Sequence, residues 1–179
     1  MATTPANLPD GLKLKRAVAR TIRRERKNTK SGRLDTQDNT ALQDLIDTFD
    51  MLGDWEERYR YLIELGRKLP PMPDAEHDES HRVRGCMSQV WLAGDVDADT
   101  RLHLRGDSDA HIVKGLIALI LALTDGRTAR EVLDTDIKAA FAQLGLESHL
   151  SMNRRNGFYA MVERIRQMAA SAVTGSDPA

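Results

Sequence analysis

The feature that most constrains the fold is an apolar run at residues 112–123, interrupted only by Lys114 and Gly115. A membrane-spanning helix needs about 20 consecutive apolar residues, so this run is too short to cross a bilayer. It instead predicts a buried helix that begins near Asp109, with its N-cap at Asp107 or Ser108. No apolar stretch typical of a secretory signal follows the N-terminus. We therefore expect no membrane segment.

The elements on either side of this run predict the order helix, sheet, helix. Apolar residues recur at helical spacing over residues 42–49 and 55–65, and again over residues 137–144 and 158–165. Between them the apolar pattern alternates around residues 83–92 and 102–104, which is typical of short strands. We therefore predict an α+β protein in which N- and C-terminal helices pack on a small antiparallel sheet of about three strands. The expected N-caps of the other helices are Asp38 or Thr40, Asp54, Thr128, Asp134 or Thr135, and Ser151.

Charge divides the chain unequally. Residues 1–35 hold ten Lys or Arg against three acids, a balance of +7, whereas residues 36–179 carry −8. We therefore predict a basic N-terminal extension at 1–37, a folded domain at 38–172 and a disordered tail at 173–179. The extension has weak helical periodicity. Several interpretations of it stay open: it could bind anions, an acidic partner or nucleic acid, it could be an organellar transit peptide, or it could be a solvated segment.

Cys86 is the only cysteine. A single thiol excludes an internal disulfide, a Cys-x-x-Cys redox pair and a zinc site built from several cysteines. It also favours a reducing compartment, so we expect the protein in the cytoplasm rather than in an organelle.

The neighbours of Cys86 allow two readings of the thiol. Gly85 permits torsions that other residues avoid, which predicts a turn between strands with the thiol at its tip. Arg82 and Arg84 would favour the reactive thiolate by placing positive charge nearby. The alternative is that Cys86 is a small buried apolar residue, which is the usual role of a lone cysteine.

Other kinds of site lack the residues they need. A cysteine hydrolase needs a positioned base, and none of the four candidate histidines lies in a local signature. A zinc site from His77, His81 and Cys86 would lack a defined fourth ligand, and residues 106–109 read better as a helix cap than as a calcium loop. No phosphate-binding loop, Gly-x-Gly-x-x-Gly or paired-carboxylate signature is present. We predict no metal site.

Residues 84–91 read Arg-Gly-Cys-Met-Ser-Gln-Val-Trp and resemble the active-site segment of SufE-type sulfur acceptor proteins, Gly-Cys-x-Ser-x-Val-Trp. Residues 55–66, 106–116 and 149–157 are similar to three further segments of that family, in the same order along the chain. The resemblance covers residues 40–170 and leaves the basic extension outside it.

The resemblance implies a compact α+β fold like that of the IscU scaffold proteins. It also implies that Cys86 accepts persulfide sulfur from a pyridoxal-phosphate-dependent cysteine desulfurase of the SufS type, and that the chain stimulates this desulfurase. The sulfur would then pass to a SufBCD-type scaffold for iron–sulfur cluster assembly. The chain would be a carrier more than a stand-alone enzyme and would itself hold no cofactor, because the pyridoxal phosphate sits on the partner.

By the same resemblance, Gln89 and Arg154 lie near Cys86 and join Arg84 and Gly85 in steadying the loop or meeting the partner. Alternatively, Gln89 faces solvent and Arg154 covers a helix end. The family places its cysteine near an apolar cavity, which Val83, Met87, Val90 and Trp91 are candidates to line, although Trp91 is expected chiefly in the core.

Two rival functions stay open alongside the main one. The chain could resemble the CsdE-like relatives, which serve a different desulfurase and pass sulfur to a different pathway. It could instead be a non-catalytic module that binds and regulates a desulfurase, with a structural cysteine. Nucleic-acid binding through the basic extension is the least favoured alternative, and no membrane partner is expected.

Overall fold

The computed structural model describes residues 37–175, with side chains from residue 41 onward. Its elements are α2 (Gln37–Met51), α3 (Trp55–Arg67), η1 (Asp74–Glu76), β1 (Val90–Val96), β2 (Leu102–Ser108), α4 (His111–Thr124), α5 (Ala129–Asp134), α6 (Ile137–Gln143), α7 (Leu146–His149) and α8 (Met152–Thr174). The predicted α+β class is confirmed. In this part of the chain, every helix is too short or too polar to span a lipid bilayer.

The domain boundaries predicted from the sequence lie close to the first and last residues that the structure describes. The basic extension at 1–37 lies almost wholly outside the described residues. At the other end, α8 continues to Thr174 and is capped by Gly175 in the left-handed conformation, so the segment predicted as a tail begins inside the last turn of this helix.

The sheet consists of β1 and β2, which pair antiparallel from Val90 opposite Ser108 to Val96 opposite Leu102. Among the described residues the expected third strand is reduced to one isolated bridge, between Arg82 and Trp91. The chain cannot continue this pairing because it turns away at Gly85, where φ is +91°. A local turn replaces the strand that the alternation predicted.

Irregular backbone covers part of each outer edge of the sheet. Along β1, the Val83 amide donates to the Val90 carbonyl at 2.8 Å, and the Leu92 amide donates to the His81 carbonyl at 2.9 Å. Along β2, the Leu102 amide donates to the Arg127 carbonyl at 2.8 Å, and the Gly126 amide donates to the carbonyl of Leu102 at 2.7 Å. Both strands therefore satisfy backbone groups that a two-stranded sheet would otherwise leave open.

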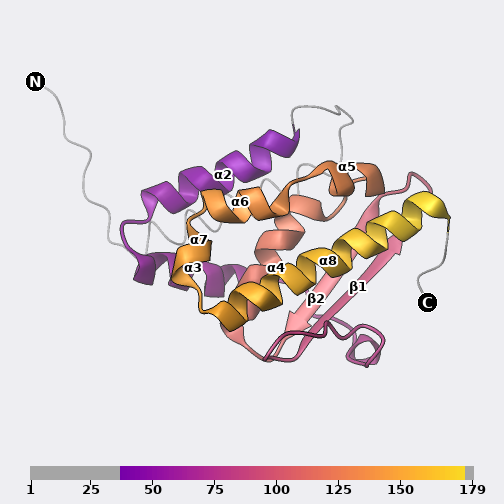
Figure 1. The fold of residues 1–179 in the computed structure, drawn as a ribbon, viewed down its shortest axis with the longest axis horizontal. Helices are drawn as coiled ribbons and strands as arrows, with labels where there is room; N and C mark the ends of the chain where they lie inside the picture. Colours follow the sequence, from indigo (N-terminus) through magenta and orange to yellow (C-terminus); the bar gives the residue numbers. More distant parts are fainter. Residues whose placement is uncertain (1–36, 176–179) are drawn as a thin grey trace, which may run out of the picture.

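The core lies between one face of the sheet and the helices, with α4 at its centre (Figure 1). α4 packs against both α3 and β2, while α8 crosses the sheet beside β1. The fully buried side chains of α4 include Leu116, Ile117 and Leu119, as expected for a helix inside the protein. The apolar run at 112–123 therefore forms the predicted buried helix.

The opposite face of the sheet is covered by the segment before β1. The Arg105 guanidinium binds both carboxylate oxygens of Glu76, at 2.6 and 2.9 Å. The His77 ring hydrogen-bonds to Asp107 at 3.1 Å and meets the Trp91 ring edge-on, with 4.9 Å between centroids. Trp91 is therefore half-buried on this outer face, and its expected place in the core is wrong.

Three of the predicted helix caps are confirmed. The Asp54 side chain accepts from the Glu57 amide and Ser151 from the Arg154 amide, while Thr128 forms a reciprocal capping box with Glu131. Each of these side chains satisfies an amide at the start of its helix that has no partner within the helix.

The other predicted caps are wrong by a few residues. α4 begins at His111 and its N-cap residue is Ala110, because Asp107 and Ser108 belong to β2. α6 is capped by Asp136 rather than by Asp134 or Thr135. α2 already begins at Gln37, so Asp38 and Thr40 lie inside the helix.

Two glycines allow α3 and α4 to cross with their backbones in contact. A Cβ atom at Gly115 would lie 2.3 Å from the Leu62 carbonyl oxygen, and one at Gly66 would lie 2.6 Å from the Gly115 nitrogen. No side chain fits in either position, so the crossing depends on glycine at both.

We expect Gly115→Ala to lower the free energy of unfolding by about 3 kcal/mol, because α3 and α4 must separate to admit the methyl group. Urea denaturation followed by circular dichroism measures the loss. Gly53→Ala is the control, since its Cβ would lie an ordinary 3.5 Å from the Glu57 carboxylate, and it should change stability by less than about 0.5 kcal/mol. Equal stability of the two variants would contradict the backbone contact.

Candidate functional site

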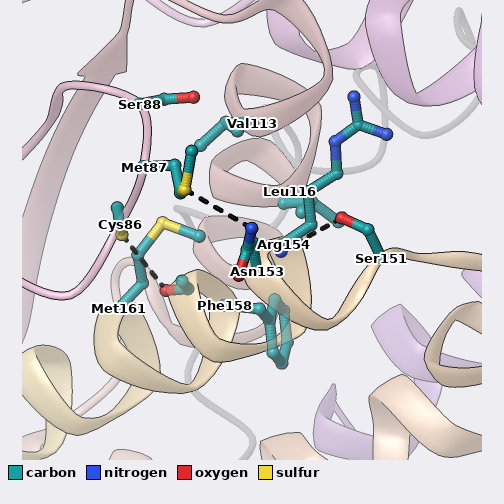
Figure 2. Close-up of a pocket in the computed structure, with 11 residues that line it drawn as sticks. Cys86, Met87, Ser88, Val113, Leu116, Ser151, Asn153, Arg154, Phe158 and Met161 are labelled. Carbon is teal, nitrogen blue, oxygen red and sulfur yellow. Dashed lines mark hydrogen bonds between the residues drawn. The ribbon is translucent and has the colours of Figure 1, made fainter.

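Cys86 lies on the loop between the Arg82 bridge and β1, immediately after the turn at Gly85. Gly85 has the left-handed torsion and reverses the chain. Figure 2 shows the residues that follow, Cys86 and Met87, beside the first turns of α8. The turn predicted from the sequence is confirmed.

The Cys86 thiol contacts the backbone of α8. Its Sγ lies 3.6 Å from the Gly157 carbonyl oxygen, to which it donates a weak hydrogen bond. A Cβ atom at Gly157 would lie only 3.1 Å from this sulfur. Glycine at position 157 therefore makes room for the thiol against the helix, which leaves Cys86 half-buried.

A cavity of about 360 Å³ opens beside the thiol. Its apolar wall comes from α4 and α8, and its polar rim comes from the loop and the first turn of α8 (Figure 2). The lining residues, with Cys86, are Met87, Ser88, Val113, Leu116, Ser151, Asn153, Arg154, Gly157, Phe158 and Met161. The site is thus a thiol at the mouth of a largely apolar pocket.

The far end of the loop is tied to the end of β2 through the backbone of Gln89. The Gln89 amide donates to the Asp109 carboxylate at 3.0 Å, and its carbonyl accepts from the Ser108 hydroxyl at 2.7 Å. Gln89 itself is exposed and does not line the pocket. It therefore holds the loop through its main chain, which does not depend on the amide side chain.

Met87 lies over the pocket and is largely exposed, with 83% of its surface accessible. The Asn153 side-chain amide donates to its sulfur at 3.4 Å. Together with the Cys86–Gly157 contact, this second weak bond is what holds the tip of the loop to α8. Both bonds involve sulfur and are individually weak.

The electrostatic surroundings of Cys86 differ from those expected. Arg82 and Arg84 both bind the carboxylate of Glu79, at 2.7 and 3.1 Å, and neither lines the pocket. Burial raises the pKa of the Cys86 thiol instead. The expectation that these arginines favour the thiolate is wrong, because their charge is paired and the partial loss of water around the sulfur dominates.

The structure separates the predicted site residues into two groups. Arg154 lies on the pocket with Cys86, and Gly85 makes the turn that precedes the thiol. Arg84 and Gln89 lie outside the pocket, on either side of the loop tip. Of the residues proposed to line an apolar cavity, Met87 does so, whereas Val83, Val90 and Trp91 do not.

Sequence reasoning missed the residues that form the pocket wall and the thiol contact. Val113, Leu116, Phe158 and Met161 read as ordinary core positions, because periodicity does not distinguish a packed face from a cavity wall. Gly157 did carry a signal: a glycine inside a long helix weakens it and so indicates a packing or functional reason.

The histidines near the loop are engaged elsewhere. His77 binds Asp107, and the His81 ring binds Asp78 at 2.8 Å. Within residues 41–175, whose side chains the structure describes, no three His, Cys, Asp or Glu side chains are grouped as a metal site would require.

Comparison with known proteins assigns the chain to a family. A family model described as "SufE: Fe-S metabolism associated domain" matches residues 43–169. An uncharacterised SufE-like protein of Rhizobium meliloti (strain 1021) is 46% identical over 134 residues, which are 73% of this chain and 95% of the relative. A second uncharacterised SufE-like protein, from Rhizobium etli, is 44% identical over 132 residues, covering 72% of this chain and 89% of the relative.

The fold has a counterpart among solved structures. The solution structure of a hypothetical protein from Thermus thermophilus superposes with a TM-score of 0.63 at 25% identity, over 75% of this chain and 96% of that one. Fold and site thus define a small α+β domain that presents one thiol beside a pocket. The chain belongs to the SufE family, a sulfur-transfer family associated with iron–sulfur metabolism.

The raised pKa of Cys86 predicts a thiol that reacts slowly at neutral pH. Only the thiolate reacts with iodoacetamide, so the rate should rise with pH around a midpoint above that of the same thiol in the unfolded chain. Alkylation rates across a pH series, in buffer and in urea, measure both midpoints on the single cysteine. A midpoint in the folded protein at or below the unfolded one would contradict the effect of burial.

Gly157→Ala is expected to push the thiol away from α8 and to speed its alkylation at neutral pH several-fold, because the new methyl group occupies the space of the sulfur. Asn156→Ala is the matched control, since this exposed neighbour on the same helix does not line the pocket. An unchanged rate in Gly157→Ala would mean that the loop does not rest against α8.

Proposed function

We propose that this chain accepts persulfide sulfur on Cys86 from a cysteine desulfurase of the SufS type, and that it passes the sulfur to a SufBCD-type scaffold for iron–sulfur cluster assembly. The observation that carries the proposal is the position of the only thiol in a SufE-family chain, half-buried at the mouth of a 360 Å³ pocket. A structural cysteine would be expected deep in the core, with no cavity beside it.

The transfer is a thiol exchange on a persulfide. The Cys86 thiolate attacks the outer sulfur of the desulfurase cysteine persulfide and forms a new S–S bond. The original S–S bond breaks, and its electron pair leaves with the desulfurase cysteine as a thiolate. Cys86 ends as a persulfide, and no external oxidant or reductant is consumed.

The resting geometry favours protection over reaction. Because burial raises the pKa of Cys86, the thiol at rest is neutral and a poor nucleophile. Attack requires the sulfur to leave the Gly157 carbonyl and reach the partner. Only two weak hydrogen bonds at the loop tip, to Gly157 and Asn153, would have to break when the desulfurase binds.

The pocket provides a place for the transferred sulfur. Val113, Leu116, Phe158 and Met161 form an apolar wall of the pocket beside Cys86. A persulfide turned toward this wall would be shielded from solvent reductants. Arg154 also lines the pocket, but its guanidinium group points away from Cys86 (Figure 2).

The cysteine count suits a carrier. With one cysteine in the whole chain, no second thiol can attack the persulfide internally and release the sulfur as sulfide. The sulfur can therefore leave Cys86 only by reaction with another molecule, such as a thiol of an acceptor protein.

In this scheme the partner desulfurase, and not this chain, removes sulfur from free cysteine. The desulfurase supplies pyridoxal phosphate and generates the persulfide, while this chain contributes an acceptor thiol and no cofactor of its own. By relieving the desulfurase of its persulfide, the chain would also speed the partner's turnover. We place this exchange in the reducing environment of the cytoplasm, where a free thiol persists.

The test is the intact mass of the purified chain after incubation with a SufS-type desulfurase and L-cysteine. We expect a gain of one sulfur atom that dithiothreitol removes. Cys86→Ser should gain none, whereas Ser148→Ala, an exposed position away from the pocket, should gain sulfur as the native chain does.

Desulfurase turnover measured in the same mixtures separates the carrier from a regulatory module. A carrier loses its stimulation of turnover together with sulfur acceptance when Cys86 is replaced by serine. If Cys86→Ser still stimulated the desulfurase fully, or if the native chain bound an active desulfurase without gaining mass, the carrier mechanism would be wrong.

A further inference from the structure

Met87 has the largest exposed fraction, 83%, of the large apolar side chains that the structure describes. It lies at the tip of the loop directly after Cys86 and lines the mouth of the pocket (Figure 2). Peroxides reach the sulfur of an exposed methionine far more easily than that of a buried one. Three other methionines, Met72, Met161 and Met168, are at most 7% exposed. Met87 is therefore open to oxidation at a position beside the thiol.

The sulfur of Met87 already faces a hydrogen-bond donor. The Asn153 side-chain amide donates to it at 3.4 Å from the first turn of α8. A thioether sulfur is a weak acceptor, whereas the oxygen of a sulfoxide is a strong one. An oxygen added to this sulfur would therefore lie within reach of a donor that is in place before the reaction.

We propose that Met87 is an oxidation site, and that its sulfoxide holds the Cys86 loop more firmly against α8 by accepting a hydrogen bond from Asn153. The oxidant is a hydroperoxide such as hydrogen peroxide. A lone pair of the Met87 sulfur attacks one peroxide oxygen, so that an S–O bond forms and the O–O bond breaks. The second oxygen leaves as water with the proton of the first. Sulfur loses two electrons, and the peroxide gains them.

The exposure of Met87 determines what its oxidation does to the fold. In a packed core, oxidation is disruptive because the polar sulfoxide is cut off from water. Most of the Met87 surface is already in water, so its oxidation costs little stability. The effect is local: one of the two weak bonds that hold the loop tip to α8 becomes an ordinary hydrogen bond.

Cys86 is the competing target for a peroxide, and its surroundings protect it. The thiol is half-buried against the Gly157 carbonyl, and burial raises its pKa, so little of it is the thiolate that peroxides attack. Below the pKa, each further pH unit removes about nine-tenths of the remaining thiolate. Oxidation of a thioether needs no ionisation. Mildly acidic solution therefore favours reaction at Met87 over reaction at Cys86.

The effect on the thiol does not depend on the proposed function. A loop held more firmly keeps the Cys86 sulfur against Gly157 and slows any reagent that requires the sulfur to be displaced. Only the matching loss of sulfur acceptance rests on the carrier role. Reduction of the sulfoxide by two thiols, which become a disulfide while the oxygen leaves as water, would restore the loop.

Alkylation of Cys86 by iodoacetamide tests the proposal in the full chain. The protein is treated with hydrogen peroxide at pH 6 and then with dithiothreitol, which restores reversibly oxidised cysteine and leaves methionine sulfoxide in place. Peptide masses should show one added oxygen on Met87, and alkylation at neutral pH should slow about threefold. Methionine sulfoxide reductase should return the rate to its original value.

Three variants separate the proposed contact from other effects of peroxide. Met87→Leu keeps an apolar loop tip without an oxidisable sulfur, so peroxide should leave its alkylation rate unchanged. Asn153→Ala removes the donor, so Met87 should gain oxygen without slowing the thiol. Met152→Leu is the matched control, because Met152 is 67% exposed and does not line the pocket, and it should respond as the native chain does. Circular dichroism verifies that the variants are folded.

The proposal is wrong if peroxide leaves Met87 unmodified, or if its oxidation leaves the alkylation rate unchanged or raises it. Equal slowing in Asn153→Ala and the native chain would also overturn it, as would slowing in Met87→Leu. Sulfur acceptance from a desulfurase is measured in the same samples. Because alkylation needs no partner, the effect of Met87 oxidation can fail while the carrier function stands, and the reverse.

Discussion

The backbone contact between α3 and α4 is the constraint on which the wall of the Cys86 pocket depends. With glycine at 66 and 115, the two helices approach until one rests on the carbonyl of Leu62. This contact fixes the depth of α4 in the core and therefore the position of Val113 and Leu116 beneath the Cys86 loop. The same helix also carries Leu123 to a second cavity near its C-terminal end. A side chain at the crossing would shift a wall of both cavities at once.

Around Cys86, protection and reactivity compete. Packing the sulfur against α8 removes water from it and so disfavours the thiolate, which is the form that attacks. A fully exposed thiol would ionise more readily but would also meet every small oxidant in solution. Two weak hydrogen bonds, from the Cys86 sulfur to Gly157 and from Asn153 to Met87, hold the loop against α8. Under the proposed function, selectivity would depend on the protein that displaces the loop rather than on the intrinsic reactivity of the thiol.

The sequence was sufficient for the parts of the fold that local patterns encode. The apolar run at 112–123 predicted the buried helix, and Gly85 predicted the turn at the thiol. The third strand and the thiolate-stabilising arginines were wrong for one reason: both depend on long-range geometry. Alternation near Val83 does not reveal that the chain turns after a single bridge, and the positions of Arg82 and Arg84 do not reveal their pairing with Glu79.

The covered edges of the sheet limit how this protein can meet others. A two-stranded sheet ordinarily leaves two rows of unpaired amides and carbonyls that invite a strand from another chain. Here the backbone near Val83 occupies part of one edge and that near Arg127 part of the other. Recruitment by strand addition, a common route to promiscuous association, is thereby obstructed. Under the proposed function, the desulfurase and the sulfur acceptor would therefore meet this chain through contacts other than an added strand.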